Sequence, residues 1–470
     1  MRELSFGSMI VGMLFVVITC IACLMQAQSD TYWHLRAGED IWRTLSIPLT
    51  DTYSYTAAGR EWPNHEWLWQ AVSYGLYSTG GFPLLLLFGA AAIDAAFVMV
   101  YRLMVGPARH RFWLMLVSLP LSASIWALRP QIVTLALLAL LLTLIARERY
   151  LWLPPLFVLW ANFHGAVALG GVVLGAVTLA ALIQARAPQP VARRRALALL
   201  MVTPLCALGT AATPMGFRLW QQIFATAARS NEARINEWIP SYPTKPFEIA
   251  FWIGAAAFLA LLFARWRRLV SWSDAALVAA ALALLPLAAR AGRNIAPFML
   301  IAVPAASRLL GANFRLSSTR DRPAEDPPRR LNSVLLGAFA VLGAGAVVTA
   351  WALPLPRLGW HPISPGALAA VRACPGPLYN QYDEGGYLIW LARTKPVFVD
   401  SRQDPYPRAF VLEAEAIEST GEYEAAFARF HITCAFLPAR SPVGPRLQKA
   451  GWWASFSDEK WAVMQAPGVL

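Results

Sequence analysis

Long apolar runs that alternate with short basic segments constrain this chain more than any other feature. About 20 apolar residues span a bilayer as a helix, and 57% of the chain is hydrophobic while only 14% is charged. We therefore predict a mainly α-helical polytopic membrane protein with about eleven spans. The apolar runs lie near residues 8–27, 81–103, 112–128, 131–146, 151–163, 165–185, 196–212, 247–264, 273–289, 294–311 and 332–353.

Two of these runs need a further interpretation. The run 8–27 competes with a cleaved signal peptide, but it has no clear small-x-small cleavage site and is long enough to span, so we interpret it as an anchor. The run 151–163 is short, and Pro154 and Pro155 interrupt it. It is expected to be a broken or half-length span, which is tolerated where backbone lines a cavity.

The arginines predict the orientation. If the N-terminus is cytoplasmic, every dense basic cluster falls on the cytoplasmic side, as the positive-inside bias requires. The opposite side then receives the loop 28–66, which has more acids than arginines, and the segment 356–470. The N-terminus is therefore expected to be cytoplasmic and the segment 356–470 extracytoplasmic. The clusters lie within residues 102–111, 147–149, 186–195, 265–268 and 308–330.

The segment 356–470 differs in character from the rest. Its charges nearly balance, and short strand-like stretches such as 396–400 and 434–438 alternate with helix-like ones. We predict a transmembrane domain over 1–355, which includes the loop 28–66, and a small extracytoplasmic α/β domain over 356–470. Cys374 and Cys434 both lie in that domain, where they can pair in an oxidising compartment or remain two buried thiols.

Several function classes lack support. The formal charge of +13 is spread over short clusters between apolar runs, without a basic face that reads nucleic acid, so no nucleic-acid partner is expected. The five cysteines make neither a zinc pattern nor a disulfide-rich framework. No nucleotide fingerprint, P-loop lysine or Ser-His-Asp arrangement is evident either.

The first outer loop carries an unusual group of polar residues. Asp30 follows the first span directly and His34 lies one helical turn later, in "HLRAGEDIW", which is typical of an amphipathic surface helix. A carboxylate at the membrane edge can act as a general base, with His34 orienting it, or hold a divalent cation such as Mg²⁺ or Mn²⁺. The alternative is that Asp30 caps a helix that begins near Tyr32. Second-rank candidates for substrate or metal contacts are Asp51, His65 and Glu66.

Three arginines lie at outer span ends, against the general charge bias. Arg129, Arg290 and Arg293 are placed to share an anion site, because the planar guanidinium grips phosphate with two donors. Snorkelling to lipid headgroups is the alternative.

Four other polar sites have structural alternatives too. Asn162 and His164 either line a cavity or hydrogen-bond between helices, and Glu237 either reaches the same cavity or caps a helix. In "VFVDSRQD", Asp400 and Arg402 are expected to lock a loop, although ligand-binding residues also follow strands in α/β domains.

These motifs together resemble the GT-C superfamily of integral-membrane glycosyltransferases, in particular an uncharacterised bacterial group with a C-terminal periplasmic domain. The resemblance covers nearly the whole chain, although each motif alone is weak. The matching residues are Asp30, His34, Gly38, Ile47, Pro48, Asp51, His65 to Leu68, Arg129 to Gln131, Asn162, His164, Gly165, Gly385 to Leu388, Val399, Asp400 and Arg402.

The resemblance implies a polyprenyl-phosphate-sugar donor, inversion at the anomeric carbon, a location in the bacterial cytoplasmic (inner) membrane, and a glycan, lipid or protein acceptor outside that membrane. Asp30 would be the base, and the three arginines would bind the donor phosphate. The loop lacks the paired acids (Asp-x-Asp or Asp-Glu) that many of these enzymes have, which leaves metal dependence open. A transporter or assembly protein for lipid-linked glycans is the alternative, but its acids are expected nearer mid-span.

Overall fold

The computed structural model describes residues 3–186, 189–232, 236–269, 271–316, 329–353 and 355–468. The chain divides into two compact units, each built from separated stretches of sequence. Unit 1 comprises Met1–Met25, Leu85–Ile223 and Arg234–Leu353, and unit 2 comprises Gln26–Leu84, Phe224–Ala233 and Pro354–Leu470.

Each of the eleven predicted spans coincides with a helix in the described part of the chain. The helices are α1 (Phe6–Ala22), α3 (Trp67–Leu103), α4 (Ala108–Ala123), α5 (Gln131–Ala146), α6 (Leu153–Phe163), α7 (Val167–Gln184), α8 (Pro190–Gly209), α10 (Pro246–Arg265), α11 (Trp272–Arg290), α12 (Ile295–Leu316) and α13 (Arg330–Ala352). The described residues include six helices that are long and apolar enough to cross a membrane, and α1, α5 and the Tyr150–Phe163 segment are shorter apolar helices. The chain is therefore a multi-pass membrane protein. The last predicted basic loop, 308–330, lies largely outside the described residues.

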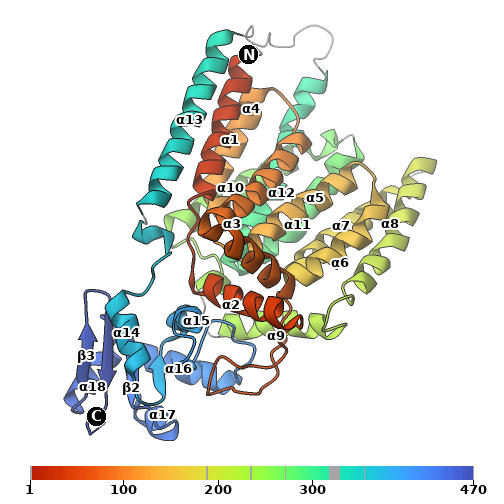
Figure 1. The fold of residues 1–470 in the computed structure, drawn as a ribbon. Helices are drawn as coiled ribbons and strands as arrows, with labels where there is room; N and C mark the ends of the chain where they lie inside the picture. Colours follow the sequence, from red (N-terminus) through yellow and green to blue (C-terminus); the bar gives the residue numbers. More distant parts are fainter. Residues whose placement is uncertain are drawn as a thin grey trace. The chain divides into compact units, whose positions relative to one another are not determined.

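The helices of unit 1 pack as a bundle around α11 and α12 (Figure 1). α11 packs against α7 and α12, α12 also contacts α4 and α10, and α8 contacts both α6 and α7. α13 packs mainly against α1, and its Val341 and Leu342 are both 72% exposed. Such exposed apolar faces suit a helix that is in contact with lipid on the side away from the protein.

The two prolines of the short run begin a helix. Pro154 and Pro155 occupy the first turn of α6, directly after the short helix η1 (Tyr150–Trp152). A proline in the first turn loses no helical hydrogen bond, because the first amides of a helix have no partner within it. The prolines therefore begin the helix rather than interrupt it, and the expected half-length span corresponds to α6. α6 is still short: at 11 residues it is about 16 Å long.

Unit 2 contains a four-stranded sheet with the strand order β1-β2-β4-β3. β1 (Leu378–Asn380) runs parallel to β2 (Cys434–Pro438), and β4 (Trp461–Gln465) pairs antiparallel with β2 and with β3 (Trp453–Ser457). The predicted strand at 434–438 is confirmed as β2. The remaining helices of this C-terminal segment are α14 (Pro365–Ala373), α15 (Tyr382–Leu391), α16 (Arg408–Thr420), α17 (Glu424–Arg429) and α18 (Val443–Lys449).

The predicted strand at 396–400 is wrong. Val397 forms only an isolated bridge with Ser54, and its amide and carbonyl bond the backbone of Tyr53 and Tyr55. The buried side chains of Val397, Phe398 and Val399 explain the strand-like sequence, because burial selects the same apolar residues as a central strand. This segment therefore pairs with the first loop.

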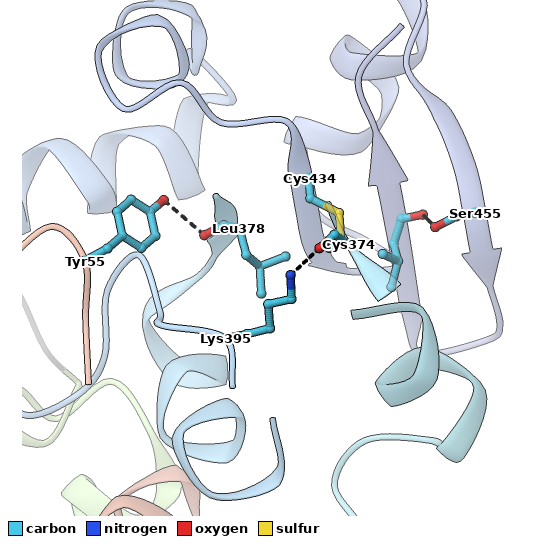
Figure 2. The surroundings of a disulfide bond; sticks show 7 residues. Tyr55, Cys374, Leu378, Lys395, Cys434 and Ser455 are labelled. Atoms are coloured by element: carbon cyan, nitrogen blue, oxygen red, sulfur yellow. Dashed lines mark hydrogen bonds between the residues drawn. A yellow bond between two sulfur atoms is a disulfide. The ribbon is translucent and has the colours of Figure 1, made fainter. Parts of the chain in front are cut away.

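Cys374 and Cys434 form a disulfide that ties the residue after α14 to the start of β2 (Figure 2). Their Cα atoms are 6.1 Å apart, and 60 residues separate them in the sequence. The Lys395 ammonium donates a hydrogen bond to the Cys374 carbonyl beside the bridge. Of the two alternatives left open by the sequence, the structure has the paired one.

The first loop and the C-terminal segment share one hydrophobic core. Trp33, Tyr53 and Trp62 from the loop pack with Leu388 and Phe436. Trp62 is 3% and Trp69 0% exposed, so both rings are buried inside the protein.

Glycines allow this close packing. The helix α2 (Ser29–Thr44) lies against α15, and a Cβ on Gly386 would stand 2.3 Å from the Ser29 carbonyl oxygen. A Cβ on Gly38 would stand 2.1 Å from the Gln70 carbonyl oxygen at the start of α3. Both distances are far below van der Waals contact, so any larger residue would push these elements apart. The sequence placed the loop 28–66 with the spans, whereas the compact units place residues 26–84 with the C-terminal segment.

Candidate functional site

Asp30 lies in the first turn of α2, beside the C-terminal segment. The helix begins at Ser29, and its N-cap is Gln28, whose backbone N–H donates to the Thr31 hydroxyl at 3.1 Å. The alternative of Asp30 as the cap of a helix near Tyr32 is therefore wrong. The partly buried Asp30 carboxylate instead accepts hydrogen bonds from Trp33 Nε1 at 3.2 Å and from the Ser401 hydroxyl.

Ser401 is itself held in place. Trp33 Nε1 also lies 3.1 Å from its hydroxyl oxygen, and the Tyr382 hydroxyl donates to its carbonyl at 3.1 Å. Gln403 Nε2 in turn donates to the Tyr382 hydroxyl at 2.6 Å. The C-terminal segment thus fixes the orientation of the Asp30 carboxylate.

Both histidines of the first loop lie near Glu66. His34, which is 2% exposed, has its Nε2 at 3.6 Å from Glu66 Oε2, and His65 Nε2 is 3.8 Å from Glu66 Oε1. His65 Nδ1 also lies 3.9 Å from Asp404 Oδ2, and the Thr226 hydroxyl donates to the other Asp404 oxygen at 3.0 Å. The predicted residues His34, His65 and Glu66 are therefore brought together, with Asp404 as an additional member.

Arg402 forms ion pairs with one carboxylate of the first loop and one of the C-terminal segment. Its Nη2 lies 2.7 Å from Asp51 Oδ1 and 2.6 Å from Asp400 Oδ2, and all three side chains are completely buried. The guanidinium also stacks within 5 Å of the rings of Tyr53, at 4.9 Å, and Trp62, at 4.8 Å. Burial alone would lower the pKa of Arg402, but Asp400 and Asp51 raise it well above its ordinary value, so it stays charged.

This ion pair decides what Asp51 can do. Asp51 is 0% exposed, and it also accepts hydrogen bonds from the Ser54 hydroxyl and amide. In this geometry Asp51 holds the loop against the C-terminal segment. A direct contact between Asp51 and a substrate, which the sequence predicted, would require Arg402 to release it.

In unit 1, two of the three predicted arginines meet around Glu237. Arg129 donates from both terminal nitrogens to the two Glu237 oxygens at 3.3 Å each, and Arg293 Nη1 donates to Oε1 at 3.2 Å. Arg293 also lies over the Trp238 ring at 4.4 Å. Arg290, at the end of α11, is exposed, and no described contact joins it to Glu237.

The arginine pair keeps Glu237 ionised. Burial alone would raise the pKa of this carboxyl, but Arg293 and Arg129 lower it below its ordinary value. Glu237 belongs to the short helix η2 (Asn236–Trp238), outside the predicted spans, and its side chain is 27% exposed. An anion is therefore already present where Arg129 and Arg293 converge.

Asn162 and His164 make contacts between helices. Asn162 Nδ2 donates to the carbonyls of Val158 and Ala212, both at 2.9 Å. His164 Nδ1 lies 2.9 Å from the Thr134 hydroxyl on α5, which also accepts from Trp160 Nε1 at 3.0 Å. These contacts match the helix-to-helix alternative for His164, and a contact with a substrate stays a prediction for both residues.

Binding of a divalent cation by the described residues stays a prediction. No group of three or more His, Cys, Asp or Glu side chains among them is placed to hold an ion. Asp51 is already bound to Arg402, and the Asp30 oxygen Oδ1 accepts from Ser401 and Trp33.

Local sequence reasoning missed Ser401 as a partner of Asp30 and Asp404 as a neighbour of His65. Both lie in the "VFVDSRQD" stretch, which stood out as a loop with an Asp–Arg lock. The many polar residues of this stretch indicated a functional or structural role. They could not indicate the partner, because 371 positions separate Ser401 from Asp30.

Comparison with known proteins gives one result at the level of fold. No family model and no curated protein matches this chain. Among solved structures, the crystal structure of ArnT from Cupriavidus metallidurans in the apo state is similar, with a TM-score of 0.50 and 12% sequence identity. The match covers 96% of this chain and 97% of that chain.

At that identity the likeness is evidence of fold alone. It confirms the predicted class, a polytopic α-helical membrane protein with a small α/β segment, and it supports the GT-C fold that the motifs implied.

One buried acid in unit 2 lies outside this site. Glu384 in α15 is 8% exposed, and its Oε2 has no hydrogen-bond partner among the described residues. Burial, together with Asp383 and Glu418, raises the pKa of Glu384 from 4.5 to about 8. The folded protein therefore holds this carboxyl in its neutral form at neutral pH.

A pH-dependent stability follows from Glu384. Because the folded state binds the proton more tightly than the unfolded state, the free energy of unfolding should fall as the pH rises from 4.5 toward 8. Glu384→Gln should flatten this slope and stabilise the protein at pH 8 by a few kcal/mol, at about 1.4 kcal/mol per pKa unit, with little effect near pH 4.5. Thermal unfolding in detergent at both pH values measures this. The control is the exposed Glu422→Gln, and an unchanged pH slope in the Glu384 variant would contradict the assignment.

Proposed function

We propose that this chain is a membrane glycosyltransferase that moves a sugar from a polyprenyl-phosphate donor to an acceptor outside the cytoplasm. The observation that carries the proposal is the placement of Asp30, whose carboxylate is held by Trp33 and Ser401 and stays partly exposed. The buried loop acid Asp51, by contrast, forms an ion pair with Arg402. The GT-C fold agrees with this function, and so do the motifs that resemble the bacterial group.

In the proposed reaction Asp30 is the general base. The carboxylate takes the proton from an acceptor hydroxyl while that oxygen attacks the anomeric carbon of the donor. The bond from that carbon to the phosphate oxygen breaks, and polyprenyl phosphate leaves with the electron pair, so the anomeric configuration is inverted. His34 lies one turn along α2, beside Glu66, where it can orient the acceptor.

The donor phosphate has a candidate partner in unit 1. Arg129 already grips the Glu237 carboxylate with two nitrogens, and a phosphate presents oxygens with similar spacing. We propose that Arg129 and Arg293 bind the donor phosphate when Glu237 yields its place. The exposed Arg290 would approach the phosphate only from the periphery of this pair.

The disulfide supports the proposed orientation. Such bonds persist in oxidising compartments, and Cys374–Cys434 lies in the segment assigned to the outer side by the arginine bias. We propose accordingly that the N-terminus is cytoplasmic and that unit 2 is extracytoplasmic.

Asp30→Asn should abolish turnover, because an amide cannot accept the acceptor proton at neutral pH. Ser401→Ala should lower turnover through misorientation of Asp30, and Ser401→Thr should restore most of it, since the hydroxyl returns. The assay measures release of polyprenyl phosphate from a panel of polyprenyl-phosphate-linked sugars in reconstituted vesicles. Glu39→Gln on the same helix, which pairs with Arg36 and Arg393, is the matched control and should be close to wild type.

The same assay separates the enzyme from a transporter. Near-normal turnover in folded Asp30→Asn would remove the proposed base. A wild-type protein that moves the lipid-linked sugar across the vesicle without releasing polyprenyl phosphate would favour the transporter.

The orientation predicts the outcome of reporter fusions. Fusions after residues 107 and 190 should be active only as cytoplasmic reporters, and those after 60 and 360 only as outer-side reporters, because of the positive-inside bias. Alkaline phosphatase and green fluorescent protein fusions measure the two sides. A reversed pattern at two or more sites would contradict the orientation and the location of unit 2.

A further inference from the structure

A pocket of about 770 Å³ opens at the α5–α6 end of unit 1. Its volume falls within the roughly 300–1,000 Å³ range of small-ligand sites. Leucines at 140, 144, 156 and 159 supply most of the wall, with Trp152 beside them. Trp152 is 65% exposed, as expected of an aromatic ring at a membrane interface.

Two arginines lie at this otherwise apolar pocket. Arg147 and Arg149 both line it, and both are exposed. Neither has a hydrogen-bond or ion-pair partner among the described side chains. Glu148, the acid between them, forms an ion pair with Arg195 of α8, whose Nη2 lies 2.6 Å from the Glu148 Oε1 atom. The pocket therefore combines an apolar wall with two positive charges that the protein does not neutralise.

The local backbone explains this separation of charges. α5 ends at Ala146, and Glu148 follows in the left-handed region with φ 54°. This conformation ends a helix and turns the chain. Glu148 is thereby paired with α8, while the arginines on either side of it line the pocket.

The pocket is distinct from the arginine pair at Glu237. Arg129 precedes α5 and Arg147 follows it, and the 16 residues of the helix separate them by about 24 Å along its axis. The two basic sites thus lie at opposite ends of one apolar helix, which places them near opposite faces of a bilayer.

We propose that this pocket binds an anionic phospholipid of the membrane. The phosphate lies between Arg147 and Arg149, and one acyl chain lies along the leucine wall. Charge complementarity favours this occupant, because a zwitterionic headgroup would bring its own cation toward the two arginines. Basic pockets between membrane helices recognise anionic headgroups in this way. The inference does not depend on the proposed transferase activity.

Native mass spectrometry of the full chain in neutral detergent tests the proposal. The protein is titrated with palmitoyl-oleoyl phosphatidylglycerol and, separately, with the phosphatidylcholine of the same chains. Wild type should prefer phosphatidylglycerol. Arg147→Gln combined with Arg149→Gln should weaken phosphatidylglycerol binding by roughly ten- to thirtyfold and leave phosphatidylcholine binding unchanged.

Two further variants make the test specific. Arg193→Gln combined with Arg194→Gln removes two exposed arginines of α8 that do not line the pocket. This double variant should leave the affinity for both lipids unchanged. Leu144→Trp fills the pocket and should weaken the binding of both lipids. Thermal unfolding confirms that each variant is folded.

Three results would overturn the proposal. The first is equal phosphatidylglycerol affinity in wild type and the Arg147/Arg149 double variant. The second is an equal loss in the Arg193/Arg194 control, which would indicate general surface charge. The third is displacement of phosphatidylglycerol by equimolar polyprenyl phosphate, which would assign the pocket to a polyprenyl lipid.

Discussion

The buried guanidinium of Arg402 is the interaction on which the arrangement of unit 2 depends. It joins Asp51 of the first loop to Asp400 of the C-terminal segment, with no exposure of any of the three side chains. Removing one partner of such a buried pair typically costs about 3–5 kcal/mol, because a charge is left without compensation. The pair therefore acts chiefly to specify one packing of the loop, and the neighbouring Ser401 then meets Asp30.

This arrangement separates the roles of two loop acids of the same chemical type. Asp51 is completely buried and paired with Arg402, while Asp30 is partly exposed and accepts hydrogen bonds from Trp33 and Ser401. In unit 1, Glu237 forms ion pairs with both Arg129 and Arg293. Each unit thus holds one element of the proposed chemistry in a defined geometry.

Hydropathy predicted the eleven apolar helices found among the described residues, because each apolar run must bury its backbone polar groups as a helix. Local pattern also found β2, but it mistook 396–400 for a strand, since the buried Val397–Val399 look alike in a sheet and beside a loop. It grouped Arg129, Arg290 and Arg293, and the structure pairs Arg129 and Arg293 with Glu237, while a shared phosphate site stays a prediction. Pairs such as Asp30–Ser401, 371 positions apart, depend on tertiary packing, and no local pattern carries them.

The most direct test of this account is a double-mutant cycle on Asp51→Asn and Arg402→Met, with unfolding free energies measured by denaturant titration in detergent. We expect the double variant to lose less than the sum of the single losses, with a coupling of at least about 1 kcal/mol. The partly exposed pair Glu39–Arg393 is the control and should couple by less than about 1 kcal/mol. Additivity at Asp51 and Arg402 within about 0.5 kcal/mol would contradict the claim that Arg402 fixes the first loop to the C-terminal segment.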